Sequence, residues 1–197
     1  MITNEQRKLL IKIARESLEG YFKKKGYTAD SKTKSTLNEK RPVFVTLYKA
    51  GKLRGCIGFN DSIYPMHEGI AKAALSAAFS DPRFPPLEEE EMKEITISIS
   101  VLTQPKMIEV RNPEEYLTKI VVGKDGVMTV GTFHSAILLP QVAVENKWDV
   151  ETFLGHCCRK ASLPNNAWRD FNMCRVYKFQ STVYEEISPN GQIKKVM

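Results

Sequence analysis

The segment Leu53-Arg-Gly-Cys-Ile-Gly58 places a cysteine beside an arginine on a short apolar run. Arg54 and Cys56 are two residues apart, so in a regular strand both side chains point to one face, about 7 Å apart along the chain. A guanidinium this close favours the reactive thiolate and can hold an anionic substrate. The two glycines indicate that another group approaches the backbone closely. The alternative is a core cysteine with an arginine paired to a surface carboxylate, since free cysteine is usually buried.

Asp81-Pro-Arg83 is the second candidate, because proline fixes an acid and a cation two residues apart in one polar corner. This corner can orient a ligand, pair with Arg54 or supply a base. The alternative is a helix C-terminal cap with a local salt bridge. His67 follows at the start of a predicted helix and is a natural acid or base near neutral pH, although a lone helix histidine is usually only a satisfied polar residue.

The cysteines favour neither disulfides nor a metal centre. There are four, at positions 56, 157, 158 and 174, and no C-x-x-C. His156-Cys-Cys158 lacks the second pair of ligands that structural zinc sites use, so we expect no metal. Gly123-Lys-Asp-Gly126 resembles a phosphate loop only superficially, because no helix is predicted after it, and a hairpin turn explains it better.

Hydrophobic periodicity predicts the elements that position these residues. A capping box at Thr3 and Gln6 begins a helix that runs towards Gly26, and strict alternation over 95–102 predicts an antiparallel strand with Thr and Ser on its exposed face. The remaining predictions are a polar loop over 27–41, hairpins at 42–49/53–59 and 120–122/127–130, helices at 65–79, 141–147 and 149–161, a strand over 174–187 and a tail over 188–197.

Length and charge bound the class of protein. A chain of 197 residues is one domain, or one domain with an insert. It has neither an apolar run of about 20 residues nor a secretory signal pattern, so we expect a cytoplasmic protein. Residues 1–60 hold fourteen Lys and Arg against five Asp and Glu. Such a surplus can mark a nucleic-acid or acidic membrane surface, although a solvated lysine-rich helix and loop is the commoner explanation.

Seven segments together resemble the AMMECR domain family, in order along nearly the whole chain. They are Leu53-Arg-Gly-Cys-Ile-Gly58, Asp81-Pro-Arg-Phe-Pro-Pro-Leu87, Ser98-Ile-Ser-Val-Leu102, Gly123-Lys-Asp-Gly-Val127, Leu139-Pro-Gln-Val-Ala143, Trp148-Asp-Val-Glu-Thr-Phe-Leu154, and Lys160-Ala161 with Trp168. The first is highly specific, and the others are weak singly. The family is named for a human protein tied to Alport nephropathy, midface hypoplasia and elliptocytosis, and it has prokaryotic members of the AmmeMemoRadiSam system protein A type.

The resemblance implies an α+β fold of two antiparallel subdomains. The larger would comprise residues 1–117 and 169–197, and the smaller would be an insert over 118–168. The Leu53 to Gly58 motif would then face a cleft between them, which raises the expectation of function for its residues.

The family's biochemical function is not established, and the resemblance implies a substrate-binding site more than a reaction. We expect Leu53, Arg54, Gly55, Cys56, Ile57, Gly58, Arg83 and His67 to bind the substrate, with Cys56 and Asp81 as catalytic candidates. The substrate can be a protein or another large molecule. Prokaryotic relatives are associated with a Memo-type protein and a radical SAM protein, which implies partners in a shared modification pathway. No cofactor is implied.

The alternative function is a nucleic-acid or regulatory protein-interaction module that uses the basic N-terminal third. Between Lys23 and Lys40 only Tyr27 offers a stacking platform, which is poor for single-strand binding. We therefore expect no nucleic acid at the Cys56 motif. The lack of a long apolar run leads us to expect no membrane either.

Overall fold

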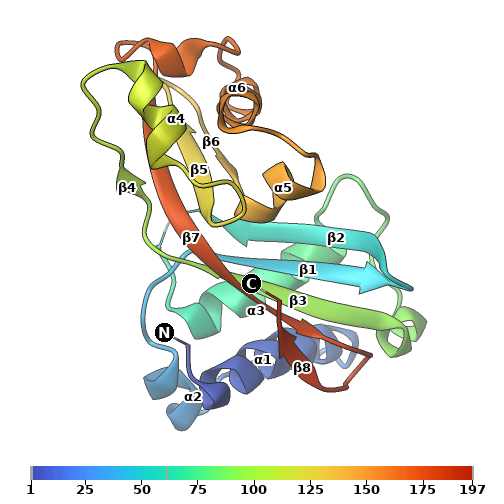
Figure 1. Ribbon diagram of the computed structural model, residues 1–197. Helices are drawn as coiled ribbons and strands as arrows, with labels where there is room; N and C mark the ends of the chain where they lie inside the picture. Colours follow the sequence, from blue (N-terminus) through green and yellow to red (C-terminus); the bar gives the residue numbers. More distant parts are fainter. Residues whose placement is uncertain (1, 61, 197) are drawn as a thin grey trace. The chain divides into compact units, whose positions relative to one another are not determined.

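The computed structural model describes residues 2–60 and 62–196, which form two compact units (Figure 1). The first unit comprises Met1–Leu102 and Thr182–Met197, and the second comprises Thr103–Ser181. The second unit thus begins before the predicted insert of 118–168 and ends after it. The extra residues belong there because β4 (Lys106–Met107) and the first part of β7 (Arg175–Glu186) pair with each other.

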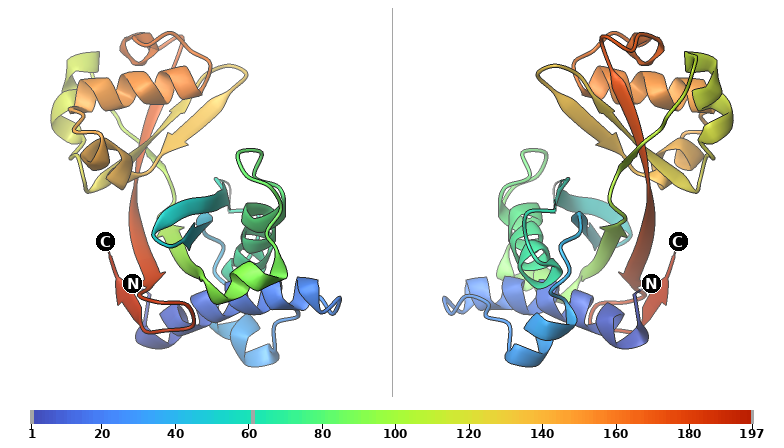
Figure 2. Two further views of the ribbon diagram at one scale, coloured as in Figure 1. Left: turned by 90° about the vertical axis from the view of Figure 1, so that its right-hand side faces the viewer. Right: turned by 90° about the vertical axis from the view of Figure 1, so that its left-hand side faces the viewer.

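The first unit is an antiparallel sheet covered on one face by helices (Figure 2). Helices α1 (Asn4–Phe22) and α3 (Met66–Phe79) pack against each other and against strands β1 (Val43–Lys49), β2 (Lys52–Phe59) and β3 (Ile95–Leu102). The shared core contains Leu10, Ile13, Val45, Ile70 and Ile97. The unit also holds α2 (Ser31–Thr36), a 3₁₀ turn η1 (Glu89–Lys93), the end of β7 and β8 (Ile193–Lys195).

Local sequence explains where these elements begin and turn. The Thr3 hydroxyl accepts a hydrogen bond from the Gln6 N–H at 3.1 Å, and the Gln6 side chain accepts one from the Thr3 N–H at 2.9 Å, so the predicted capping box is confirmed. Ala50 and Gly51 join β1 to β2 with φ of 49° and 74°, the positive values that a tight two-residue hairpin requires.

The pairing of β2 with β1 contains an irregularity at the motif. Leu47 lies opposite Gly55 but Tyr48 lies opposite Leu53, so Arg54 is the extra residue of a bulge. The strand order is β2-β1-β3, which makes β2 the edge strand of this unit. A bulge on an edge strand re-aims the side chain it carries, so the two-residue periodicity of a regular strand does not hold for Arg54.

In the second unit, α6 (Val150–Lys160) packs on β5 (Asp125–Val130) and β6 (Ser135–Leu138). The Asp149 side chain caps α6 by accepting from the Thr152 N–H at 2.8 Å, as its position predicts. The unit is completed by η2 (Pro113–Glu115), α4 (Tyr116–Lys119), α5 (Pro140–Glu145), η3 (Ala167–Arg169), β4 and the start of β7.

Four sequence predictions were wrong. Residues 27–41 contain α2, because Asp30 caps a short helix by accepting from the Thr33 N–H at 2.7 Å. Residues 120–122 form no strand, because the Asp125 carboxylate holds them in a turn through the Val121 N–H at 3.0 Å. The segment 188–197 contains β8, which pairs with β7. Ser98 and Ser100 are buried, so the Thr and Ser face of β3 is not the exposed face that the alternation predicts.

In the described part of the chain, no helix has both the length and the apolar character that crossing a membrane requires.

Candidate functional site

The candidate site is centred on Cys56, whose backbone lies on the outer edge of β2. Asp81, just after α3, accepts the Cys56 N–H through Oδ2 at 2.8 Å. Arg83 donates from Nη2 to the Cys56 carbonyl oxygen at 3.2 Å. The Asp81-Pro-Arg83 corner therefore binds both outward-facing peptide groups of Cys56, as a neighbouring strand would, and blocks this part of the edge from further pairing.

Asp81 is buried and fully engaged in this arrangement. Its side chain is 2% exposed, and it accepts from Arg83 Nε at 2.9 Å, from Arg83 Nη2 at 2.6 Å and from the Arg83 backbone N–H at 3.1 Å. The hydrogen bond from Arg83, together with that from Cys56, holds the pKa of the Asp81 carboxyl far below its usual range. A carboxylate stabilised in this way is a weak base, so the geometry favours a positioning role over proton abstraction.

The Cys56 side chain lies on the sheet face opposite the helices. A Cβ on the preceding Gly55 would meet Ala77 of α3, and successive side chains alternate between faces. The Cys56 Sγ is 3.1 Å from the Thr46 Oγ1, directly across the strand pair. Cys56 is half-buried, whereas Cys157, Cys158 and Cys174 are buried. It is therefore the most accessible of the four thiols.

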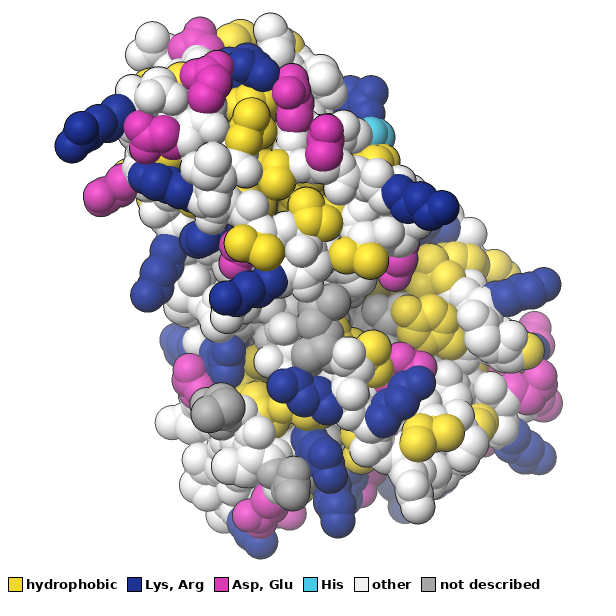
Figure 3. Space-filling view, viewed as in Figure 1, with side chains coloured by type: hydrophobic (Ala, Val, Ile, Leu, Met, Phe, Trp, Pro, Cys, Tyr) yellow, Lys and Arg dark blue, Asp and Glu magenta, His cyan; other side chains and the backbone are white. Residues whose placement is uncertain are grey.

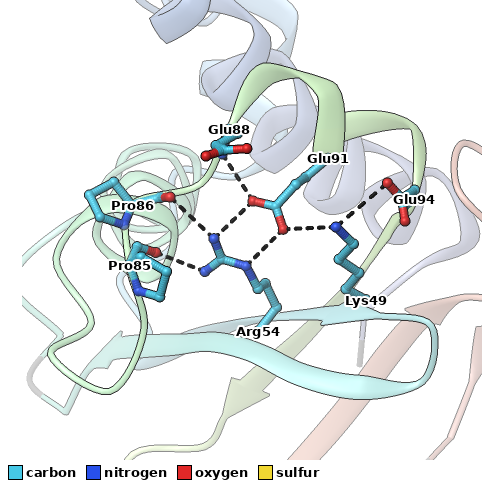
Figure 4. Close-up of polar contacts among 7 residues, drawn as sticks. All are labelled: Lys49, Arg54, Pro85, Pro86, Glu88, Glu91 and Glu94. Atoms are coloured by element: carbon cyan, nitrogen blue, oxygen red, sulfur yellow. Dashed lines mark hydrogen bonds and ion pairs between the residues drawn. The ribbon is translucent and has the colours of Figure 1, made fainter.

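Arg54 does not join this group, contrary to the prediction that it pairs with Asp81. It makes a two-point ion pair with Glu91, from Nε to Oε1 at 3.0 Å and from Nη2 to Oε2 at 2.8 Å (Figure 4). Its Nη1 and Nη2 also donate to the carbonyl oxygens of Pro85 and Pro86, at 2.9 and 3.2 Å. The side chain is 12% exposed. With all three nitrogens engaged, Arg54 is poorly placed to anchor a substrate anion.

Glu91 is the residue that holds this second network together. Besides Arg54 it accepts from the Glu88 N–H at 3.0 Å and from Lys49 Nζ at 3.2 Å. These partners, Arg54 first, lower the pKa of the Glu91 carboxyl from 4.5 to about 2. The sequence showed Glu91 only as the last of four consecutive glutamates. The spacing of Glu88 and Glu91 is that of a capping box, and this is the sequence signal that could have identified Glu91.

The glycines of the motif are explained by contacts within the protein. An added Cβ on Gly55 would lie 2.1 Å from the Ala77 carbonyl oxygen, and one on Gly58 would lie 2.3 Å from the Phe44 ring. The predicted close approach is therefore made by α3 and by an aromatic ring of β1. Leu53 is exposed and Ile57 packs against the core of the first unit.

His67 lies apart from Cys56. It occupies the first turn of α3 and lines a separate cavity with Tyr27, Lys34 and Lys72 among others. Ala77, which contacts β2, is ten residues further along this helix, or about 15 Å at 1.5 Å per residue. The structure therefore does not bring His67 to the thiol, which periodicity alone could not reveal.

Two other sequence features have structural explanations. His156 stacks on Trp148 with ring centroids 3.7 Å apart, and within the described residues no group of three His, Cys, Asp or Glu side chains is placed to hold a metal ion.

Several lysines of the basic N-terminal third are in ion pairs, namely Lys12 with Glu16, Lys23 with Glu19, Lys32 with Glu5 and Lys49 with Glu91. Figure 3 shows Lys and Arg side chains spread over the visible face with Asp and Glu between them.

An α+β protein with an antiparallel sheet and an edge-strand Leu-Arg-Gly-Cys-Ile-Gly motif is the class that fold and site define. The AMMECR1 family model matches residues 11–184, so the chain belongs to the AMMECR1 family.

Archaeal relatives and a crystal structure agree with this assignment. The chain is 42% identical to protein MJ0810 of Methanocaldococcus jannaschii over 98% of this chain and 96% of that protein. It is 43% identical to protein MK0488 of Methanopyrus kandleri over 98% and 95%. The crystal structure of the uncharacterised protein PH0010 from Pyrococcus horikoshii matches with a TM-score of 0.92 and 44% identity over 98% of each chain.

Proposed function

We propose that the surface around Cys56 is a substrate-binding site, in which the thiol contacts the substrate and Arg83 holds an anionic part of it. The observation that carries the proposal is the combination of a half-buried thiol and a backbone whose N–H and carbonyl oxygen are both held, by Asp81 and Arg83 respectively. A nucleophile or contact atom is most useful when the surrounding protein already holds its position.

Of the two arginines predicted to bind the substrate, only Arg83 is the anion anchor in this proposal. Its side chain is 54% exposed, whereas that of Arg54 is 12% exposed. Arg83 uses Nε and Nη2 for its bonds to Asp81 and Cys56, and Nη1 has no hydrogen-bond partner within the described residues. A guanidinium that is oriented by a buried carboxylate and still has a free donor suits a carboxylate or phosphate. The Memo-type and radical SAM partners stay a prediction.

Alkylation kinetics test this arrangement. Iodoacetamide followed by mass spectrometry should label Cys56 before the three buried cysteines under native conditions. The anionic reagent iodoacetate should gain from the neighbouring cation, so Arg83→Gln should lower the ratio of the iodoacetate rate to the iodoacetamide rate at Cys56. Lys52→Gln on the same strand removes an equal charge without touching Cys56 and is the control. Cys56 reacting no faster than the buried thiols, or a ratio unaffected by Arg83→Gln, would refute the proposal.

A further inference from the structure

The second unit brings lysines together on three adjacent segments. Strand β7 pairs with β4 on one side and with β5 on the other. Lys106 of β4 lies directly opposite Lys178 of β7, and Lys124 immediately precedes Asp125 of β5. Like charges directly opposite each other in an antiparallel pair destabilise it, so this pairing calls for a compensating negative charge.

These three lysines line one cavity of about 350 Å³, within the range of small-molecule sites. All of its lining residues belong to the second unit: Thr103, Gln104, Lys106, Val121, Lys124, Asp125, Lys178, Phe179 and Gln180. They come from the segment around β4, the turn before β5 and the middle of β7, so the cavity lies across paired strands instead of on a loose loop.

The cavity has more positive than negative charge. Asp125 is its only acidic lining residue, and that side chain is 4% exposed and accepts from the Val121 N–H at 3.0 Å. Lys178 Nζ lies 3.4 Å from Asp125 Oδ2 and donates to the Lys119 carbonyl oxygen at 2.6 Å. Asp125 therefore offsets Lys178. Lys106 and Lys124 are exposed and have no ion-pair partner within the described residues.

We propose that this cavity binds a small molecule through a phosphate group, held by Lys106 and Lys124, with Lys178 opposite Lys106 across the strand pair. Lysine ammonium groups are compact point charges that suit phosphate. A phosphate also supplies the counter-charge that Lys106 and Lys124 lack, whereas Asp125 already offsets Lys178. The site does not include Cys56, so its experimental test is independent of the test of the proposed function.

Calorimetric titration of the full chain with pyrophosphate, at constant ionic strength, tests the site. Wild-type protein should bind pyrophosphate, and Lys106→Gln and Lys124→Gln should each weaken binding about tenfold, the effect of one charge-assisted hydrogen bond. Lys147→Gln, an exposed lysine of the same unit that does not line the cavity, should leave the affinity unchanged.

Thermal unfolding provides a second readout. Without ligand, Lys106→Gln should raise the Tm slightly because it reduces the positive charge crowded around the cavity, while the Tm increase caused by pyrophosphate should shrink. The proposal is overturned if pyrophosphate does not bind, if the two variants and Lys147→Gln bind equally, or if sodium chloride of matched ionic strength raises the Tm as much. It is also overturned if a single-stranded RNA binds through these lysines and pyrophosphate does not compete with the RNA for the protein.

Discussion

Arg54 and Glu91 show how one residue pair changes the interpretation of a motif. Each side chain is little exposed, and the pair has four hydrogen-bonded neighbours in Lys49, the Glu88 N–H and two proline carbonyls. Removing one member of such a pair leaves the other buried without its counter-charge. Arg54 is therefore expected to support the shape of the edge strand and the Pro85-Pro86 turn, and to contribute little to substrate binding directly.

Glu91→Gln should lower the free energy of unfolding by about 3 kcal/mol at neutral pH, because Arg54 loses its counter-charge. The folded state lowers the pKa of the Glu91 carboxyl from 4.5 to about 2, so this stabilisation is present above pH 4.5 and is lost as the pH falls towards 2. Urea denaturation at several pH values should show the difference between wild type and Glu91→Gln shrinking across that window.

Glu94→Gln is the matched control for that measurement. Glu94 is 57% exposed and its ion pair with Lys49 spans 3.5 Å, so its removal should cost less than about 0.5 kcal/mol. A difference between wild type and Glu91→Gln that stayed constant from pH 6 to pH 2 would contradict the assigned role of the carboxylate.

At the scale of elements, the contact between β2 and α3 fixes where the site lies. Gly55 allows the strand backbone to approach the carbonyl oxygen of Ala77, and Asp81 lies two residues after the end of the same helix. The strand and the Asp81-Pro-Arg83 corner are therefore positioned by one packing contact. A displaced helix would carry Asp81 away from the Cys56 N–H.

Gly55→Ala should lower the free energy of unfolding by about 2 kcal/mol, because a Cβ 2.1 Å from a backbone oxygen forces α3 to move. The rate at which Cys56 is alkylated should also change in this variant, because the Asp81-Pro-Arg83 corner no longer lies in line with the Cys56 peptide groups. Gly69→Ala on the same helix is the comparison, because its nearest neighbour would be 3.2 Å away and alanine favours the helix. Equal losses in the two variants would argue against this contact as the determinant.

At the scale of the whole molecule, the first helix and the last long strand of the chain are joined in the core of the first unit. Arg15 of α1 forms a buried two-point ion pair with Glu186 of β7, 171 residues away, with Arg15 Nε 3.0 Å from Oε1. Glu186 also accepts from the Ile97 N–H of β3 at 3.0 Å, and Arg15 donates to the Ile95 carbonyl oxygen at 2.9 Å. One pair thus connects a helix and two strands.

Glu186→Gln should cost 3 kcal/mol or more in urea denaturation, roughly the effect of leaving a buried arginine without its partner. The neighbouring pair of Glu185 and Lys194 is more exposed and spans 3.7 Å, so Glu185→Gln should cost less than about 1 kcal/mol. If the two variants had similar stabilities, the buried pair could not be what joins the termini to the sheet.

Sequence patterns predicted most of the elements because their signals are local. The capping box of α1, the tight turn of the first hairpin, the alternation in β3 and the cap of α6 each depend on residues only a few positions apart. The motif segments likewise indicated the AMMECR family, which the family model confirms. Three of the failures were also local: a short helix, a turn and a short strand whose signals are weak. The fourth, the exposed face predicted for Ser98 and Ser100, depends on tertiary packing.

The sequence by itself determined the class of fold, the family and the candidates Cys56, Asp81 and Arg83. Only the tertiary structure decided which partner each charged side chain takes, because Arg54 and Glu91 are 37 residues apart and Cys56 and Asp81 are 25 apart. Several acids along the chain could have paired with Arg54. The bulge in β2 and the packing of α3 determine which acid pairs with Arg54, and this geometry leaves Cys56 half-buried and Arg83 exposed while it encloses Arg54.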